Sequence, residues 1–231
     1  MQLDSVRVLD LSRLLPGPYA TQLLADAGAE VVKIEDTGSG DYARAMPPYT
    51  EGGDGAIFDA VNRGKRSVAL DLKSEGGQRA LHRLAEDADV VLETFRPTVV
   101  DRLGIDYGSL RETNEALVYC SLTGYGQGGP LADRAGHDLN YIGRAGMLDL
   151  TREGEDARPQ IPGYTVADIA GGLFAAFSIV SALLSRELGP GGGEYIDVSM
   201  TDVVLSFSQA VVQPVFEGEQ PRPGEGELNG G

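Results

Sequence analysis

Short apolar segments alternate with longer amphipathic segments along most of the chain. The short segments are rich in Val, Ile and Leu, as in strands buried on both faces, and the longer ones have the 3.6-residue period of helices. The pattern predicts strands at 6–11, 30–35, 67–72, 89–95, 116–122 and 194–198, and helices at 18–27, 74–87, 167–188 and 201–212. This alternation predicts an α/β fold with a mainly parallel sheet.

The longest apolar stretch, residues 171–184, is expected to form a buried helix. Two serines interrupt it and charged residues flank it. No stretch reaches the roughly 18 apolar residues that a bilayer span requires. The N-terminus also lacks the basic-then-apolar pattern of a signal peptide. We therefore expect a cytoplasmic protein with no membrane partner.

The last part of the chain differs in composition from the rest. Residues 216–231 are rich in Pro, Gly and Glu and have no apolar period, which is typical of a linker or tail. We therefore expect one large domain at residues 1–205, followed by a linker at residues 206–231.

The chain is strongly acidic, with 35 Asp and Glu against 19 Lys and Arg and a net charge of −16 over 231 residues. Such a surface repels phosphate backbones, which argues against nucleic acid as a partner. High acidity with few lysines predicts a salt-adapted protein, and full stability and activity in dilute buffer would contradict that hypothesis. The single cysteine excludes a disulfide framework and a Cys-clustered zinc site, and no metal site is expected.

His137 and Asp168 are the candidate catalytic residues. His137 follows a glycine at the start of a predicted helix, and the adjacent Asp138 is placed to cap that helix or to orient the imidazole. The residues alone leave a structural role for His137 equally open. Asp168 begins the long apolar helix, where capping is the commoner use of aspartate. However, Gly171 and Gly172 cost helix stability, which is easier to explain if something approaches the backbone closely. A carboxylate at a helix N-terminus is expected to stay ionised, ready to act as base or nucleophile.

Cationic residues gather at two places in this acidic chain. Arg63, Lys65 and Arg66 lie within four residues, and Arg96 follows the strand predicted at 89–95. A local cluster of cations indicates an anionic ligand, and we favour a small molecule that carries phosphate over a random surface scatter.

Seven segments in chain order resemble a known family. They are VLDLSRLLPGPYATQLLADAGAEVVKIE, NRGKRSVALDLK, ETFRPTVVDRLGIDY, LVYCSLTGYGQGGP, AGHDLNY, VADIAGGL and YIDVSM. From Val8 to about Asp202 the chain resembles the class III CoA-transferase and α-methylacyl-CoA racemase family. The resemblance implies a Rossmann-like large domain, a small second domain that is truncated here, and two chains interlocked as a homodimer. It also implies acyl-CoA substrates, so coenzyme A enters as part of the substrate and no cofactor is expected to stay bound.

The resemblance assigns a reaction to the two candidate residues. The transferase branch uses an aspartate nucleophile in the motif that matches VADIAGG, which is Asp168 here. The racemase branch uses the same aspartate with a histidine in the motif that matches AGHDLNY, which is His137. Because transferases commonly carry an aromatic residue at that position, we favour a racemase or epimerase of 2-methylacyl-CoA thioesters that works through an enolate. The alternatives are CoA transfer between carboxylic acids through an aspartyl-CoA thioester, and a truncated CoA-binding chain without catalysis.

The resemblance also suggests supporting roles. Backbone N–H groups near Asp168 and Gly136 are candidates to stabilise the enolate oxygen, with Asp138 orienting His137. One departure is Asp36, which stands where some relatives carry a basic residue. The residues expected to contact coenzyme A are Arg63, Lys65, Arg66 and Arg96 at its phosphates, together with Gly136 and Tyr141.

Overall fold

The computed structural model describes residues 3–154, 156–220 and 223. In these residues six strands form one sheet in the order β3-β2-β1-β4-β5-β6, and every neighbouring pair is parallel. The strands are β1 (Arg7–Asp10), β2 (Glu30–Glu35), β3 (Arg66–Ala69), β4 (Val90–Glu93), β5 (Val118–Thr123) and β6 (Glu194–Ser199). The strand order reverses between β1 and β4, which defines a doubly wound α/β fold. The predicted α/β class is therefore confirmed.

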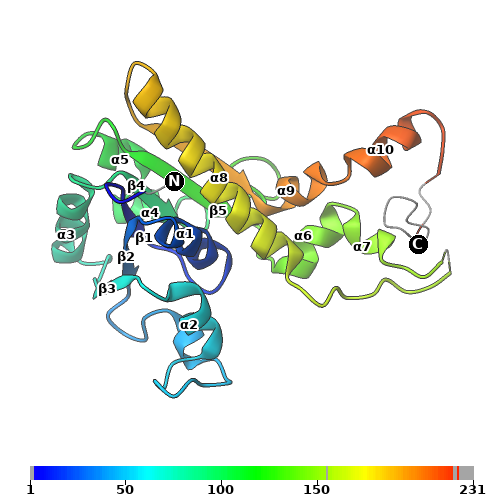
Figure 1. The fold of residues 1–231 in the computed structure, drawn as a ribbon, viewed down its shortest axis with the longest axis horizontal. Coiled ribbons are helices and arrows are strands. Elements are labelled where there is room, and N and C mark those ends of the chain that lie inside the picture. Colours follow the sequence, from blue (N-terminus) through cyan, green and yellow to red (C-terminus); the bar gives the residue numbers. More distant parts are fainter. Residues whose placement is uncertain (1–2, 155, 221–222, 224–231) are drawn as a thin grey trace.

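Helices cover both faces of this sheet (Figure 1). One layer holds α1 (Pro16–Asp26), α6 (Asp138–Arg144), α8 (Val166–Leu188) and α9 (Met200–Ser206), and the other holds α3 (Glu75–Ala85), α4 (Val99–Leu103) and α5 (Tyr107–Arg111). Along β4, Leu92 packs into the core beneath α1 and α8, and Val91 packs into the core beneath α3. Burial on both faces explains why the strands are continuous apolar runs in the sequence.

Several short helices lie outside the predicted pattern. They are the 3-10 helix η1 (Tyr42–Ala45), α2 (Ala56–Asn62), α4, α5 and α7 (Met147–Leu150). The helix predicted at 201–212 is two helices, α9 and α10 (Gln209–Phe216), which lead away from the sheet (Figure 1). Helix α10 lies within the range expected to be a linker, and none of its residues is buried. Positions 221–222 and 224–231 of that range lie outside the described residues.

Helix α8 is the one described helix that is long and apolar enough to cross a membrane. Nine of its residues are buried, and it packs against α1, β5 and α9 in the manner of a core helix. The predicted helix is confirmed, but it is buried on one face only. Its remaining face leaves Leu173, Phe177 and Leu184 exposed.

The two glycines near the start of α8 allow neighbouring helices to approach its backbone. A Cβ atom added at Gly172 would lie 2.5 Å from the carbonyl oxygen of Pro16, in α1. A Cβ atom added at Gly171 would lie 2.5 Å from Cγ of Met200, in α9. The close approach expected from the sequence is therefore made by helix packing.

Gly172→Ala is expected to destabilise the protein by about 1–2 kcal/mol, because overpacking against a backbone carbonyl outweighs the gain of about 1 kcal/mol in helix propensity. Gly171→Ala is the matched control, with a smaller loss because the Met200 side chain can rotate. Urea denaturation measures both. Equal losses in the two variants would contradict this explanation.

Candidate active site

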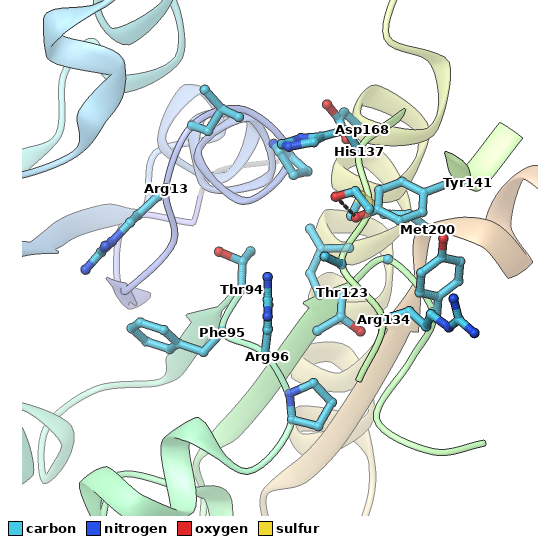
Figure 2. Close-up of a pocket in the computed structure, with 18 of the residues that line it drawn as sticks. Arg13, Thr94, Phe95, Arg96, Thr123, Arg134, His137, Tyr141, Asp168 and Met200 are labelled. Atoms are coloured by element: carbon cyan, nitrogen blue, oxygen red, sulfur yellow. Dashed lines mark hydrogen bonds between the residues drawn. The ribbon is translucent and has the colours of Figure 1, made fainter. Parts of the chain in front are cut away.

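A pocket of about 590 Å³ opens at the carboxyl ends of β1, β4 and β5 (Figure 2). The segment after β1 contributes Leu11 and Arg13, and the segment after β4 contributes Phe95 and Arg96. Thr123, the last residue of β5, completes this side. The pocket therefore lies at the point where the strand order reverses, which is where doubly wound sheets bind ligands.

Asp168 and His137 line this pocket together, although they come from different helices. Asp168 is the third residue of α8, whose N-terminal cap is Thr165, so Asp168 is not the capping residue. His137 is the N-terminal cap of α6, and its backbone N–H donates to Oδ1 of Asn140 at 2.9 Å. Figure 2 shows the two side chains next to each other at one end of the pocket.

The carboxyl group of Asp168 is harder to ionise than an ordinary aspartate. Its pKa is raised to about 6, chiefly by burial and also by the negative charge of Asp138, while His137 acts in the opposite direction. The sequence led us to expect a carboxylate kept fully ionised by the helix N-terminus. Desolvation outweighs that effect here. A group that titrates near neutral pH in a pocket is typical of a nucleophile or base.

Asp138 has a role that the sequence did not predict. Its Oδ1 accepts hydrogen bonds from the backbone N–H groups of Ala167, at 2.6 Å, and Asp168, at 3.1 Å. It therefore caps α8 and fixes the backbone that carries Asp168, while its orienting role toward His137 stays a prediction. The same contact occupies the N–H group of Asp168, which is therefore not available to stabilise an oxyanion, whereas the role expected for N–H groups near Gly136 stays a prediction.

Tyr141 supports the loop that carries His137. Its hydroxyl donates to the carbonyl oxygen of Gly136 at 2.6 Å, and its ring lies edge-on to Tyr125 with centroids 5.1 Å apart. Burial raises the pKa of Tyr141 to about 12, so the hydroxyl stays a donor. Gly136 and Tyr141 both line the pocket, and their contact with coenzyme A remains a prediction.

The expected role of Lys65 at the CoA phosphates is wrong. Its side chain is 2% exposed, and its Nζ lies 3.1 Å from Oδ2 of Asp10. Nζ also donates to the Thr21 hydroxyl at 2.7 Å and to the Pro18 carbonyl at 2.8 Å. Desolvation lowers the pKa of Lys65, and the charge of Asp10 opposes that change. The ammonium group is therefore part of the interior and faces no ligand.

The other predicted cations separate in space. Arg63 forms an ion pair with Asp26, and Arg66 forms one with Glu30 at 2.7 Å, both on the exposed surface. Neither arginine lines the pocket, whereas Arg96 does. The three neighbouring cations in the sequence therefore do not form one site.

The pocket also contains charged and polar residues that sequence reasoning missed, namely Arg13, Tyr42, Thr123 and Arg134. Arg13 lies 3.5 Å from Asp36, so the departure noted in the sequence is an ion-pair partner of a pocket arginine. The sequence did contain a signal for two of them, since Arg13 and Thr123 lie near the carboxyl ends of predicted strands, where doubly wound sheets bind ligands.

Buried ion pairs shape the wall of the pocket after β1. Lys33 lies 3.0 Å from Oδ2 of Asp41 and donates to the carbonyl oxygen of Ser12 at 2.9 Å. Both carboxylate oxygens of Asp41 accept from the N–H of Leu14, at 3.2 Å. Leu14 lines the pocket with a φ of 67°, a strained value for a residue other than glycine. The ion pairs hold this loop in its strained conformation.

Comparisons with known proteins agree with one another. The family model of CoA-transferase family III matches residues 3–230. A succinate–glutarate CoA-transferase of Agrobacterium fabrum is 44% identical over 207 residues, covering 87% of this chain and 51% of that protein. A succinyl-CoA:mesaconate CoA-transferase of Haloarcula hispanica is 39% identical over 233 residues, covering 95% of this chain and 57% of that protein.

Solved structures give the same result. A CAIB/BAIF family protein from Brucella suis superposes with a TM-score of 0.89 at 40% identity, over 95% of this chain and 59% of that chain. The chain thus spans about half the length of the curated relatives that it matches.

Proposed function

Because this chain belongs to CoA-transferase family III, we propose that it transfers coenzyme A between carboxylic acids with Asp168 as the nucleophile. The observation that carries the proposal is the position of Asp168, which is the aspartate of VADIAGG and lies in the pocket at the sheet's switch point. The names of two relatives also support it, since one is a succinate–glutarate CoA-transferase and the other a succinyl-CoA:mesaconate CoA-transferase. This reaction is the first alternative that the sequence left open.

In the proposed reaction the carboxylate of Asp168 is the nucleophile in the first step and the leaving group in the last. One oxygen attacks the thioester carbon of an acyl-CoA, the C–S bond breaks, and a mixed anhydride and CoA thiolate form. The thiolate then attacks the aspartyl carbonyl and releases the first acid as a carboxylate, which leaves an aspartyl-CoA thioester. The carboxylate of the second acid attacks this thioester, the C–S bond breaks, and a second mixed anhydride and CoA thiolate form. The thiolate then attacks the acyl carbonyl of this anhydride, which forms the new acyl-CoA and releases the carboxylate of Asp168. Each step exchanges one leaving group for one nucleophile, so no net proton is required.

The remaining pocket residues have supporting roles in this proposal. Arg13 and Arg96 lie at the ends of β1 and β4, where they are placed to hold CoA phosphates. Asp138 holds the first turn of α8 in place. Treatment with acyl-CoA followed by hydroxylamine tests the reaction, since an activated Asp168 gives a hydroxamate that peptide mass spectrometry detects. Absence of any adduct at Asp168 would contradict the proposal.

Transfer is expected to depend on pH with a midpoint of about 6, the pKa of Asp168. The nucleophile is the ionised form, so kcat/KM rises with pH below the midpoint and is constant above it. Asp138→Asn is expected to lower the midpoint, because it removes a neighbouring negative charge while an amide oxygen can still cap α8. Burial remains in that variant, so the midpoint should stay above the ordinary value of 3.8. A wild-type midpoint near 4 would show that the pocket does not desolvate Asp168.

A second candidate function is racemisation of 2-methylacyl-CoA thioesters. The position of His137 beside Asp168 favours it, because a neutral imidazole and a carboxylate can serve the two faces of an α-carbon. Racemisation predicts exchange of the α-proton with deuterated solvent, lost in His137→Ala. Transfer predicts no exchange and an adduct on Asp168. Binding of acyl-CoA with neither result would identify a chain that only binds coenzyme A.

Three properties of the whole protein belong to the same proposal. A homodimer is supported by the apolar residues that α8 and α9 leave exposed, such as Phe177 and Leu205. Adaptation to salt is supported by the net charge of −16. A cytoplasmic location fits substrates made of coenzyme A. Sedimentation and activity measured across a range of salt concentrations test the first two.

A further inference from the structure

Arg134 is a cation of the pocket without a countercharge. No described carboxylate forms an ion pair with it, although the chain has a large excess of acidic residues. Eight other described arginines do form such pairs or bond to backbone carbonyls, Arg13 with Asp36 among them. An unpaired guanidinium in a pocket is available to an anionic ligand.

Thr123 supplies a second unused polar group. Its side chain is 9% exposed and lines the same pocket, and its hydroxyl has no hydrogen-bond partner among the described residues. A buried hydroxyl without a partner costs free energy, so such groups in a binding pocket usually meet a ligand atom. In the view of Figure 2, Thr123 lies between the side chains of Arg96 and Arg134.

The position of Arg134 separates it from the arginines assigned to coenzyme A. Arg13 and Arg96 follow β1 and β4, at the crevice where the strand order reverses. Arg134 follows β5 and lies three residues before His137 in the loop that ends at the start of α6. Because it is close in the chain to His137, its ligand is expected on the acyl chain.

We propose that Arg134 and Thr123 form a subsite for a second carboxylate, so that the preferred substrates are dicarboxylic acids and their CoA thioesters. The proposal rests on the proposed CoA transfer. A carboxylate accepts two parallel N–H bonds from one guanidinium and a further bond from a hydroxyl, which satisfies both unused groups at once. A terminal methyl group would leave both unsatisfied. The relatives named for succinate, glutarate and mesaconate act on acids of this class.

The test compares two unreactive CoA thioethers of equal length, S-(3-carboxypropyl)-CoA and S-butyl-CoA. Neither has a thioester carbonyl, so their binding is independent of any reaction at Asp168. We expect the chain to bind the carboxylate compound about tenfold more tightly or better, as measured by titration calorimetry. Arg134→Gln is expected to reduce this preference to within about twofold, and Thr123→Val to reduce it several-fold.

Two further variants separate the subsite from general charge effects. Arg96→Gln is expected to weaken both thioethers equally, since it acts on the phosphates that they share. Arg79→Gln removes the same charge from the exposed face of α3 and is expected to change neither affinity. Thermal unfolding of each variant verifies that it is folded.

Two results would overturn the subsite. A wild-type chain that binds both thioethers equally has no site for a second carboxylate. Equal weakening of both compounds by Arg134→Gln would place this arginine at coenzyme A. The proposed transfer is tested separately by the hydroxylamine adduct on Asp168 with succinyl-CoA. An adduct without a binding preference for the carboxylate compound supports the transfer and rejects the subsite. A binding preference without an adduct supports the subsite and rejects the transfer.

Discussion

Replacing Asp168 with Asn is expected to lower CoA transfer by about 10³-fold or more, because the amide cannot form the anhydride and thioester intermediates. The substitution keeps the size of the side chain and leaves the backbone bonds from Ala167 and Asp168 to Asp138 in place. Binding of an unreactive CoA thioether should therefore change little, so the loss should fall on kcat. Steady-state kinetics and the hydroxylamine adduct measure the two parts.

Asp133→Asn is the matched control, since Asp133 is an exposed carboxylate in the loop before His137 and does not line the pocket. It should transfer CoA at the wild-type rate. Turnover by Asp168→Asn close to that of the wild type would exclude Asp168 as the nucleophile in transfer and as a partner of His137 in racemisation.

Lys65→Met is expected to destabilise the fold by about 3–5 kcal/mol, because it removes the ammonium group that contacts the buried carboxylate of Asp10. Asp10 is 0% exposed, and its pKa is held below the ordinary value by the charges of Lys65 and Lys33, which outweigh the opposing effect of burial. Urea denaturation at neutral pH measures the loss. The double variant Asp10→Asn/Lys65→Met should recover part of the stability, since no unpaired charge remains.

Arg66→Met is the control for this variant. Arg66 pairs with Glu30 on the exposed surface, so its loss should leave the unfolding midpoint nearly unchanged. Equal effects of Lys65→Met and Arg66→Met would show that the buried pair contributes no more than a surface pair.

Acid unfolding provides a second measure of the buried carboxylates. Burial raises the pKa of Glu35, but hydrogen bonds from Arg44, Ser67 and the backbone of Asp41 outweigh it and hold the value at about 2. A carboxylate with a lowered folded-state pKa contributes stability above its ordinary value, 4.5 for Glu35, and this contribution is lost as the pH falls towards 2. We expect the free energy of unfolding to decrease over that range, and to decrease less in Glu35→Gln.

The sheet was predictable because its strands carry a signal within each segment. The strand predicted at 30–35 has the observed bounds of β2, and those for β4 and β5 differ by one or two residues at each end. Parallel strands buried on both faces are apolar throughout, and local sequence alone shows that pattern. Helices α4, α5 and α7 have four or five residues, too few to show a helical period, and the sequence did not predict them.

The site was predictable only in part, because proximity in sequence differs from proximity in space. His137 and Asp168 were identified and share a pocket. Lys65 was assigned to a ligand because Arg63 and Arg66 stand next to it, but its partner Asp10 is 55 positions away. Arg134 was overlooked because nothing local shows that an arginine lacks a countercharge. That property depends on every carboxylate that the fold brings near.

Burial of the lysines also determines which amines of this protein can be acylated. An enzyme that forms anhydrides and thioesters produces reactive acyl groups, and an uncharged amine attacks them. The chain has three lysines, Lys33, Lys65 and Lys73. Lys33 and Lys65 are enclosed with Asp41 and Asp10, and their side chains are at most 2% exposed. Lys73 is exposed and is the one ε-amine in this chain open to modification by the acyl groups of the proposed reaction.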